Sequence, residues 1–535
     1  MPSLNWIGKE KIVNHDKDVP FRLMRKNKKY SLGNSENLIL EGDNLEALKA
    51  LMPFYYGKIK CIYIDPPYNT GNEKWVYNDK VNSPKIKEWL GKVVGPEDED
   101  LTRHDKWLCM MYPRLKLLRD LLSDDGVIFI SIDDTEHCYL KQILDDIFGP
   151  ENFVANIIWQ KKYAASNDAK YFSDSHDFIV CYAKKKNKNG DRNGWVRNLL
   201  PRTDKQDSLY KYDSGDGKGL WRPDNLTVKT YSKEYDYPIT NPKTGKKYYP
   251  TQGRCWLSNK KTILKWIDEG RIFFGKDGKG APQLKRYLNE VQSGTVPMTI
   301  WSYEEVGHTD EARKELKIIF RDTKSPFENP KPTRLIKRIL QVAMGQNDLI
   351  LDSFAGSGTT AHAVLDLNKE DGGNRKFILV ELEKNIAKNI TAERVKRVAK
   401  GYSYKTGKGK TVKVAGLGGN FEYVELGPAL FSADGNINEK VSFEEMASYV
   451  YFTETLSNIE KRRIKGIFIG EYNDTEYHVL FKKKGDNVLN RAALKGIKKD
   501  EKRKVVYADK CLLGKEILEQ YGIAFKQIPY QVRVY

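Results

Sequence analysis

Short apolar runs alternate with amphipathic segments along the first third of the chain. Residues 60–64 and 126–132 are apolar nearly throughout, and residues 37–43 form a shorter run that ends in Gly-Asp. Runs of this kind suit central parallel strands that are covered on both faces. Residues 44–52 repeat leucine at every third position, and residues 107–122 carry a helical pattern of apolar side chains. This alternation predicts an α/β fold with a mostly parallel central sheet.

The same alternation returns after residue 329. The residues Asn-Pro-Lys-Pro-Thr precede a predicted helix over 334–344, and strands are expected at 348–352 and 376–381. Further helices are expected at 361–368 and 386–400 from the spacing of their apolar residues. We therefore expect a single α/β domain whose sequence is interrupted by an insertion.

The residues between the two α/β segments have a different composition. Lysine, asparagine, glycine and aromatic residues dominate there, and only residues 257–267 show a helical period. Residues 403–420 are rich in glycine and lysine, which is typical of a linker or an exposed hairpin. The expected organisation begins with an N-terminal arm or small cap (1–30). It continues with the first part of the α/β domain (31–160), an inserted domain (161–325), the second part of the α/β domain (326–400), a linker (401–420) and a C-terminal domain of mixed type (421–535).

The balance of charge adds a polyanionic partner to this picture. The chain has 91 lysine and arginine residues against 72 aspartate and glutamate residues, a formal net charge of +19. Such an excess favours nucleic acid ahead of a membrane surface. No run of about 18 apolar residues is present, so we expect no membrane span, and the polar N-terminal residues favour a cytoplasmic protein. The six cysteines form no CxxC pair, which argues against disulfides and against a zinc site.

A glycine loop follows the predicted strand at 348–352, in the segment LILDSFAGSGTTAHAV. Gly356 and Gly358 allow a ligand close to the backbone, and the helix that follows offers free N–H groups to a carboxylate or phosphate. Glu381 ends the next strand, where an acid can accept the hydroxyl hydrogens of a ribose. These features predict half of a nucleoside site. The spacing of Gly356, Gly358 and Ala361 also fits a dinucleotide fingerprint, so a nucleotide-dependent oxidoreductase remains an alternative, as does a turn without a ligand.

The segment CIYIDPPYNTG, residues 61–71, ends an apolar strand on a carboxylate. The carboxyl ends of strands are where open α/β sheets place their ligands, so Asp65 is a candidate for chemistry. Pro66 presents a carbonyl without an N–H group of its own, and Tyr68 offers a flat surface on which a base can stack. The Asp65 carboxylate and the Pro66 carbonyl suit the two hydrogens of an exocyclic amino group. The alternative is a proline-rich turn whose acid caps a helix.

A second acidic segment, Asp133, Asp134 and Glu136, follows the predicted strand at 126–132. Three carboxylates this close together are compatible with a metal site. Acids are also common at the start of a helix, where they face the positive end of its dipole. We expect an acidic helix start and no metal, since none of the seven histidines lies in a ligand-like cluster.

Two motifs and their order carry a family resemblance. Asp-Pro-Pro-Tyr at 65–68, together with Phe-Ala-Gly-Ser-Gly at 354–358, resembles the amino-group DNA methyltransferases that use S-adenosylmethionine. The catalytic motif precedes the cofactor loop, and this order resembles the beta class. Longer segments are similar to the modification subunits of type III restriction systems and their solitary relatives, namely EGDNLEALKAL, DPPYNTG, MMYPRL, DGVIFISIDDTE, NPKPTRLI, LDSFAGSGTT, GNFEYVELGPALF and YVYFTET.

The resemblance implies a catalytic set of Asp65, Pro66 and Tyr68 in a Rossmann-like methyltransferase domain. It also implies N6 of adenine as the acceptor, because an aspartate at this position is associated with adenine more than with N4 of cytosine, where serine often replaces it. The target adenine would be flipped out of the duplex and would stack on Tyr68. No metal is implied.

The resemblance further implies S-adenosylmethionine as the cofactor. Glu381 would hold its ribose, Asp43 would lie near its adenine, and Lys331 would border its methionine carboxylate. The full set of implied cofactor-binding residues is Asp43, Lys331, Asp352, Phe354, Gly356, Gly358, Thr359 and Glu381.

The implied partners follow from the same family. They are double-stranded DNA, read by the insert as a target-recognition domain, a second copy of this chain in a homodimer, and a restriction endonuclease or translocase subunit. The alternatives are a cytosine-N4 methyltransferase, an enzyme acting on RNA, a catalytically silent DNA-binding subunit and the oxidoreductase. The DNA recognition sequence does not follow from the chain.

Overall fold

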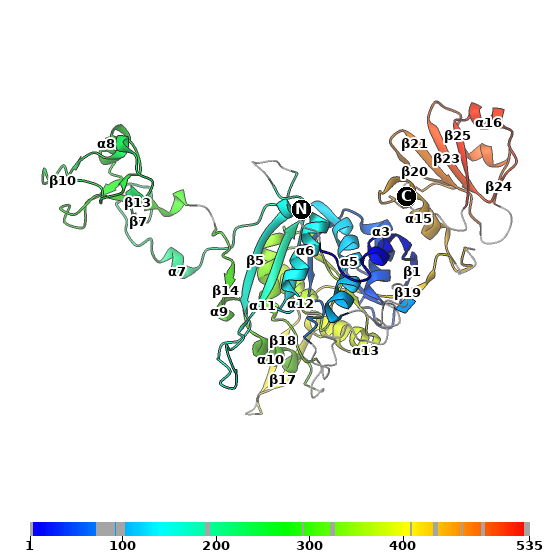
Figure 1. Cartoon of the computed structure of the whole chain (residues 1–535), viewed down its shortest axis with the longest axis horizontal. Helices are drawn as coiled ribbons and strands as arrows, with labels where there is room; N and C mark the ends of the chain where they lie inside the picture. The colour runs from blue at the N-terminus through cyan, green and yellow to red at the C-terminus, as the bar shows by residue number, and fades with distance from the viewer. Residues whose placement is uncertain are drawn as a thin grey trace. The chain divides into compact units, whose positions relative to one another are not determined.

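The computed structural model describes residues 4–70, 91–92, 102–187, 193–291, 294–321, 327–406, 409–431, 437–460, 462, 464–482 and 487–528. The chain divides into two compact units (Figure 1). The larger unit contains residues Met1–Asn198 and Met298–Tyr535, and the smaller unit contains residues Leu199–Pro297.

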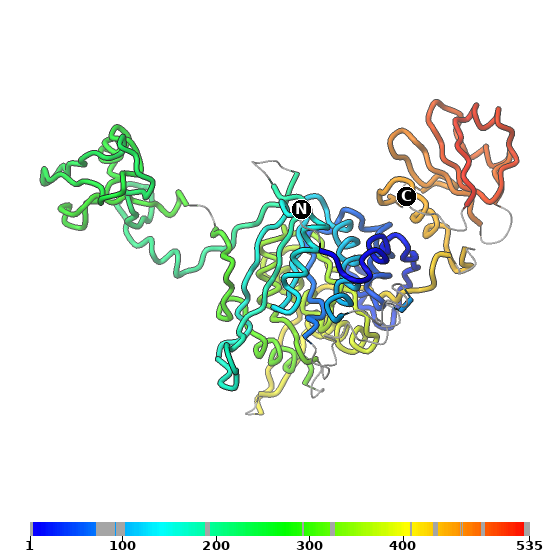
Figure 2. The backbone as a smooth tube through the Cα atoms, in the orientation of Figure 1, coloured from blue at the N-terminus to red at the C-terminus, as the bar shows by residue number. Residues whose placement is uncertain are grey.

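A ten-stranded sheet is the centre of the larger unit. Six neighbouring strands in its middle are parallel, which confirms the expected α/β fold, and the strands beyond them include antiparallel pairs. The spatial order is β1 (Arg22–Lys26), β19 (Glu422–Ala429), β2 (Leu38–Glu41), β16 (Lys376–Glu381), β15 (Leu349–Asp352), β3 (Ile59–Ile64), β4 (Leu122–Ile132), β6 (His176–Ala183), β5 (Phe153–Gln160) and β14 (Ile300–Trp301). Strands from distant parts of the chain are therefore neighbours in this sheet, and the colours of Figure 2 show distant segments of the chain running through the same unit.

Helices pack against the sheet in two groups. The first group is α3 (Asn44–Tyr55), α5 (Arg103–Leu121) and α6 (His137–Phe148), and the second is α11 (Thr333–Ala343), α12 (Thr359–Asp371) and α14 (Ala392–Lys400). The leucines that predicted the first of these helices are buried in the core with residues of β3 and β4, because they share one face of α3. A short helix α13 (Lys384–Ile386) and a π-turn (Ala387–Thr391) lead into α14.

Residues 4–30 belong to the larger unit and pack against its core, so they do not form a separate arm. Two short helices, α1 (Lys9–Ile12) and α2 (His15–Asp18), precede β1, which pairs antiparallel with β19 at the edge of the sheet. Ile12 is fully buried. The sequence pattern misled because β1, Arg-Leu-Met-Arg-Lys, carries basic side chains at a sheet edge and resembles a polar tail.

The expected boundaries of the insert and of the C-terminal domain also differ from the structure. Residues 161–198 and 298–325 fall in the larger unit, where they contribute β6, β14, α9 (Tyr303–Val306) and α10 (Thr309–Ile319). Likewise β19, expected in the C-terminal domain, is a central-sheet strand. The segment 403–420 contains most of the hairpin of β17 (Gly401–Lys405) and β18 (Thr411–Ala415), which favours the predicted hairpin over a linker.

The smaller unit has its own core and little regular structure. Its elements are α7 (Asp204–Asp207), β7 (Trp221–Asp224), β8 (Thr227–Val228), β9 (Ile239–Thr240), β10 (Lys247–Tyr248), β11 (Cys255–Trp256), α8 (Lys260–Asp268), β12 (Ile272–Phe273) and β13 (Gln283–Tyr287). Helix α8 corresponds to the helix expected at 257–267. Its Ile263 packs with Leu226, Trp256 and Leu284 in a small hydrophobic cluster.

The C-terminal part of the chain is of mixed type, as expected. Helix α15 (Phe443–Thr455) packs on a four-stranded sheet of β20 (Phe468–Tyr472), β21 (Thr475–Val479), β23 (Arg503–Ala508) and β25 (Ile523–Gln527). Strands β22 (Val488–Leu489) and β24 (Lys510–Cys511) pair separately, and α16 (Lys515–Gln520) lies against β25. Among the residues that the structure describes, no helix is long and apolar enough to cross a membrane.

Because the N-terminal residues contribute to the core of the larger unit, truncating a buried side chain among them should lower the stability of the fold. Replacing Ile12 by Ala deletes buried methyl groups and leaves a cavity, so the free energy of unfolding should fall by about 2–5 kcal/mol. Lys11→Ala at the neighbouring exposed position is the matched control and should change it by less than about 0.5 kcal/mol. The measurement is denaturant unfolding of both variants. Equal stability of the two variants would mean that these residues are an independent arm after all.

Candidate active site

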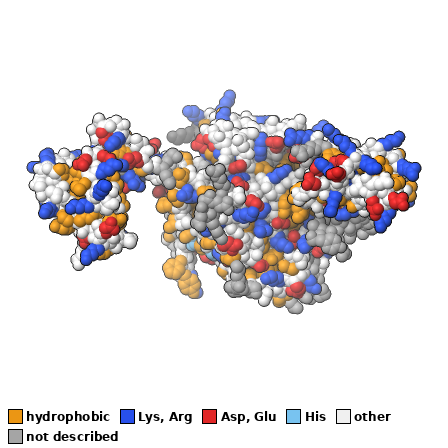
Figure 3. All heavy atoms as spheres, turned by 90° about the horizontal axis from the view of Figure 1, so that it is seen from above, with side chains coloured by type: hydrophobic (Ala, Val, Ile, Leu, Met, Phe, Trp, Pro, Cys, Tyr) orange, Lys and Arg blue, Asp and Glu red, His pale blue; other side chains and the backbone are white. Residues whose placement is uncertain are grey.

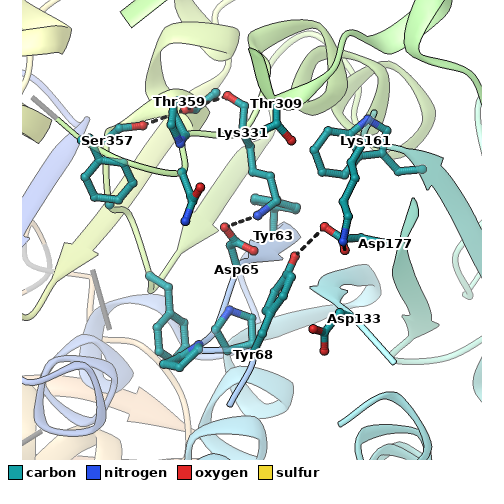
Figure 4. A pocket seen from close by; sticks show the side chains of 18 of the residues that line it. Tyr63, Asp65, Tyr68, Asp133, Lys161, Asp177, Thr309, Lys331, Ser357 and Thr359 are labelled. Carbon is teal, nitrogen blue, oxygen red and sulfur yellow. Dashed lines mark hydrogen bonds and ion pairs between the residues drawn. The ribbon is translucent and has the colours of Figure 1, made fainter. Parts of the chain in front are cut away.

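A cavity of about 510 Å³ lies at the carboxyl ends of β3 and β15. Parallel strands bring their carboxyl ends to the same sheet edge, so residues far apart in sequence meet here. Figure 4 shows the side chains that point into this space. Eight of the predicted site residues line the cavity: Asp65, Pro66, Tyr68, Lys331, Asp352, Phe354, Gly356 and Thr359. Asp43, Gly358 and Glu381 are not among the lining residues. The catalytic and cofactor-binding roles of all these residues stay predictions.

Asp43 lies between β2 and α3, where it caps the helix. Its Oδ1 accepts the N–H groups of Leu45 at 2.9 Å and Glu46 at 3.2 Å, and its Oδ2 lies 3.4 Å from the guanidinium of Arg114. A carboxylate at this position satisfies N–H groups that the first turn of a helix leaves without partners. The side chain therefore has a structural role that is independent of any cofactor.

Asp65 follows the last residue of β3 and pairs with Lys331. The Lys331 ammonium group contacts Oδ2 of Asp65 and lies 5.1 Å from the centre of the Tyr68 ring. The other carboxylate oxygen, Oδ1, is buried and has no hydrogen-bond partner among the described residues. The lysine therefore orients the carboxylate through one oxygen and leaves the other without a hydrogen-bond partner among the described residues. Lys331 thus touches the predicted catalytic motif, a contact that its expected place beside the methionine carboxylate did not include.

The turn after Asp65 is held rigidly by its neighbours. The indole N–H of Trp107 donates to the carbonyl of Pro67 at 2.7 Å. Asn69 adopts a left-handed conformation, with φ of 58°, that asparagine tolerates better than most residues. Its buried amide donates to the carboxylate of Glu136, which also contacts His104 Nδ1 at 2.8 Å.

Glu136 therefore has a different role from the one expected for it. It precedes α6 but makes no side-chain capping bond to that helix, and its side chain is fully buried against Asn69. Burial raises the pKa of Glu136, and the hydrogen bond from Asn69 and the charge of His104 oppose the rise. The acidic segment is thus not simply a helix start. Sequence reasoning missed the pairing of Asn69 with Glu136, because nothing in the sequence joins two residues 67 positions apart.

Tyr68 forms a hydrogen bond with a residue of a second ion pair, which the sequence did not predict. Its hydroxyl donates to Oδ2 of Asp177 at 3.4 Å, and Oδ1 of Asp177 lies 2.6 Å from the Lys161 ammonium group (Figure 4). Burial, followed by the charges of Asp177 and Asp65, raises the pKa of Tyr68 well above its ordinary value. The phenol therefore stays protonated and serves as a hydrogen-bond donor and a flat apolar surface.

The glycine loop between β15 and α12 has the geometry that its sequence predicts. Gly356 and Gly358 have φ of 49° and 74°, in the left-handed region that favours glycine. At Gly358, a Cβ atom would come within 3.2 Å of the carbonyl oxygen of Thr391. Glu381 lies at the end of β16, and its Oε2 accepts the N–H of Gly356 at 2.8 Å. Its visible role is to hold the loop.

A buried arginine supports the same loop. Arg394, on α14, is fully buried. Its guanidinium donates to Thr359 Oγ1 at 2.8 Å, Ser357 Oγ at 3.1 Å, Thr333 Oγ1 at 3.1 Å, His362 Nδ1 at 3.1 Å and Glu315 Oε2 at 3.2 Å. Burial, together with the charge of Arg394, lowers the pKa of His362 to about 3, so the imidazole is neutral and accepts. This network fixes the hydroxyl groups of Ser357 and Thr359, two residues that line the cavity.

Asp352, the last residue of β15, is buried beneath the loop. It accepts hydrogen bonds from Thr360 Oγ1 at 2.5 Å and from the N–H of Phe354 at 3.0 Å. These bonds favour the charged form, but burial dominates and raises the pKa of Asp352 to about 7. The nearby charges of Asp65 and Glu381 act in the same direction as burial. Asp352 thus shapes the loop rather than supplying a permanent charge.

The raised pKa of Asp352 predicts a pH dependence of stability. The folded chain keeps this proton up to about pH 7, whereas the unfolded chain releases it near pH 3.8. Binding of the proton therefore stabilises the folded state fully at low pH. This contribution to the free energy of unfolding is lost as the pH rises through about 7. Asp352→Asn keeps a neutral side chain of the same shape. Its thermal midpoint, relative to that of the unsubstituted chain, should rise between about pH 5 and pH 8. The exposed Asp134→Asn is the control. Parallel curves for Asp352→Asn and the unsubstituted chain would contradict the assignment.

Comparison with known proteins places this arrangement in a family. A family model described as DNA methylase matches residues 59–393, more than half of the chain. The type III restriction-modification enzyme StyLTI Mod subunit of Salmonella typhimurium is 37% identical over 390 residues, which cover 70% of this chain and 56% of that subunit. The type II methyltransferase M.KpnI of Klebsiella pneumoniae is 31% identical over 383 residues, which cover 68% of this chain and 84% of M.KpnI.

The matches do not extend over the whole of the larger relatives. The chain spans 56% to 65% of the length of the StyLTI, EcoP15I and EcoPI Mod subunits. The similarity to a solved structure of the Thermus thermophilus putative DNA modification methylase TTHA0409, complexed with S-adenosyl-L-methionine, extends over 68% of this chain and 95% of that chain. The sequence identity is 14% and the TM-score is 0.31, and no conclusion is drawn from this similarity. The family match includes both the Asp65 turn and the glycine loop, and the chain belongs to the DNA methylase family.

Proposed function

We propose that this chain transfers a methyl group from S-adenosylmethionine to N6 of an adenine in duplex DNA. The observation that carries the proposal is the Asp65 carboxylate. One of its oxygens is paired with Lys331, and the other is a buried acceptor without a hydrogen-bond partner among the described residues. A buried acceptor that lacks a partner is costly unless a ligand supplies the donor, and an exocyclic amino group is a donor of the right kind.

The residues around the cavity fit the proposed cofactor. Its volume of about 510 Å³ lies in the range of about 300–1,000 Å³ that is usual for small-molecule sites. The loop of Phe354, Gly356 and Thr359 would hold the methionine part, where the N-terminus of α12 favours a carboxylate. When bound, S-adenosylmethionine supplies an electrophilic methyl group.

The chain's own residues perform the rest of the proposed chemistry. Oδ1 of Asp65 and the carbonyl of Pro66 accept the two hydrogens of the amino group, which favours a tetrahedral nitrogen with an available lone pair. As the nitrogen gains a methyl group it loses one proton, and Asp65 receives that proton. Tyr68, fixed by Asp177, stacks on the base. Holding the reactants in attack geometry contributes about 7–11 kcal/mol.

Adenine is the preferred acceptor in this proposal for two reasons. The first residue of the DPPY motif is aspartate, the form associated with adenine N6. In addition, the curated relatives at 31–37% identity include several type III Mod subunits. Methylation of cytosine N4 is the second candidate, since the same carboxylate and carbonyl also suit the amino group of cytosine.

The smaller unit, residues 199–297, is proposed to read the DNA sequence. It has a hydrophobic cluster of its own. Its exposed lysines include Lys211, Lys218, Lys246 and Lys247. Figure 3 shows basic side chains scattered over the visible face, with acidic side chains among them. Cations placed in this way contact phosphates, which position a protein on a duplex. A restriction subunit and a second copy of this chain are proposed partners, by analogy with the relatives named Mod subunits.

Replacing Asp65 by Asn tests the proposed chemistry. Asn keeps the shape of the side chain but cannot take up the amino proton, so methyl transfer should fall at least about 100-fold. S-adenosylmethionine binding, measured by calorimetry, should change little. Transfer is measured with labelled S-adenosylmethionine and unmodified duplex DNA, followed by digestion and identification of the modified nucleoside. Asp134→Asn, an exposed acid that follows the neighbouring strand β4, is the matched control and should transfer normally.

The nucleoside analysis separates the alternatives. Label in N6-methyladenine supports the proposal, and label in N4-methylcytosine supports the second candidate. Turnover of Asp65→Asn at the rate of the control would remove Asp65 from its role. Binding of DNA and cofactor without label from the unsubstituted chain would indicate a silent DNA-binding subunit.

A further inference from the structure

The hairpin between β5 and β6 ends in two aromatic side chains that are exposed to solvent. Tyr171 is 83% exposed and Phe172 is 96% exposed, which are the two highest values among the large hydrophobic residues that the structure describes. Exposed apolar groups that lie together often mark a place where another molecule binds. The proposed chemistry uses neither residue.

The hairpin lies at the same sheet edge as Asp65. Strand β4 pairs parallel with β3 and antiparallel with β6, so the start of β6 and the end of β5 lie at the carboxyl end of β3. Lys161, Lys162 and Asp174, at the base of the hairpin, line the cavity that contains Asp65. Figure 1 shows this connection extending beyond its two strands. The aromatic pair is therefore carried by a segment that begins at the wall of the active site.

The base of the hairpin is well supported. The N–H groups of Lys161 and Lys162 donate to the carbonyl of Ser175 at 2.9 and 3.2 Å. The Lys161 ammonium group lies 2.9 Å from Asp174. Nearer the tip, the N–H of Ser166 donates to Ser173 Oγ at 2.7 Å. These bonds hold the two arms together, so the hairpin can present its tip in a defined direction.

Charge beside the tip favours a polyanionic partner. Lys170 is exposed, and its ammonium group lies 5.4 Å from the centre of the Tyr171 ring. Lys162 is exposed on the other arm. Aromatic side chains that stack on bases, next to cations that contact phosphates, are the usual combination in proteins that bind unpaired nucleic acid.

We propose that Tyr171 and Phe172 insert into the duplex beside the target base and occupy the space that the base leaves when it is extruded. The proposal rests on the proposed function, since it requires a flipped base. Extrusion breaks stacking and pairing, and apolar side chains such as Phe inserted between base steps are a known means of stabilising a distorted duplex. The pair thus lowers the cost of bringing the base to Tyr68.

The test compares paired and mismatched DNA. The methylated position is first mapped by sequencing DNA treated with the unsubstituted chain. Rates are then measured for the Tyr171→Ala/Phe172→Ala double variant on a duplex with a normal target pair and on one with a mismatch opposite the target, which is already easy to extrude. We expect kcat/KM on the paired duplex to fall about tenfold or more and the loss on the mismatched duplex to be no more than about twofold.

A second measurement follows extrusion of the base directly. The fluorescence of 2-aminopurine at the target position rises when the base is extruded, and on the paired duplex this rise should be smaller for the double variant.

A matched control is available in the C-terminal part. Tyr472 and Leu512 are also exposed, at 40% and 72%, and lie outside the cavity lining. The Tyr472→Ala/Leu512→Ala double variant should methylate both duplexes at the rate of the unsubstituted chain. Thermal unfolding of both double variants establishes that each is folded.

Several outcomes would overturn the inference. Equal losses on the two duplexes would mean that the pair serves catalysis or folding rather than extrusion. Normal rates on both would mean that the pair does not enter the duplex. A change of molecular mass in solution with normal rates would assign the pair to a protein interface. If the unsubstituted chain itself methylates no DNA, the proposed function fails together with this inference. In the three outcomes above, the unsubstituted chain is active, so only the inference fails.

Discussion

A carboxylate that lies inside a protein cavity loses hydration, and this loss must be compensated by charge or by hydrogen bonds. Asp65 meets this constraint with the ammonium group of Lys331. Because the lysine contacts one oxygen only, the second oxygen is left as an acceptor in the cavity wall. The arrangement is neutral as a pair yet keeps a strong acceptor available, and the rest of the site is built to keep it in place.

Rigid neighbours maintain that geometry on both sides. The turn that carries Asp65 is fixed through Trp107 and through the pair of Asn69 and Glu136. The glycine loop opposite is fixed by Glu381 and by Arg394. Both sets consist of polar side chains that are largely removed from water and that form hydrogen bonds with the segments they support. The cavity is thus bounded by two stiff segments that come from different strands.

The sequence was informative wherever a structure depends on neighbouring residues. The apolar runs of β3 and β4, the glycines of the loop and the acid at the end of β3 each follow from local patterns, and the structure confirms these elements. Partners that meet only in the folded chain could not be found in this way. Asp177 lies 109 positions from Tyr68. Arg394 lies in an amphipathic helix whose charged residues would be expected to face solvent, but it is fully buried.

Lys331 shows why two motifs that are far apart in the sequence form one site. Its ammonium group pairs with Asp65, and its backbone carbonyl accepts a hydrogen bond from Thr359 Oγ1 at 3.2 Å. One residue therefore joins the turn after β3 to the loop after β15. A largely buried ion pair adds little to stability compared with apolar residues of similar size. The placement of a lysine at this junction is therefore better explained by the need to position the carboxylate relative to the loop than by any contribution to folding.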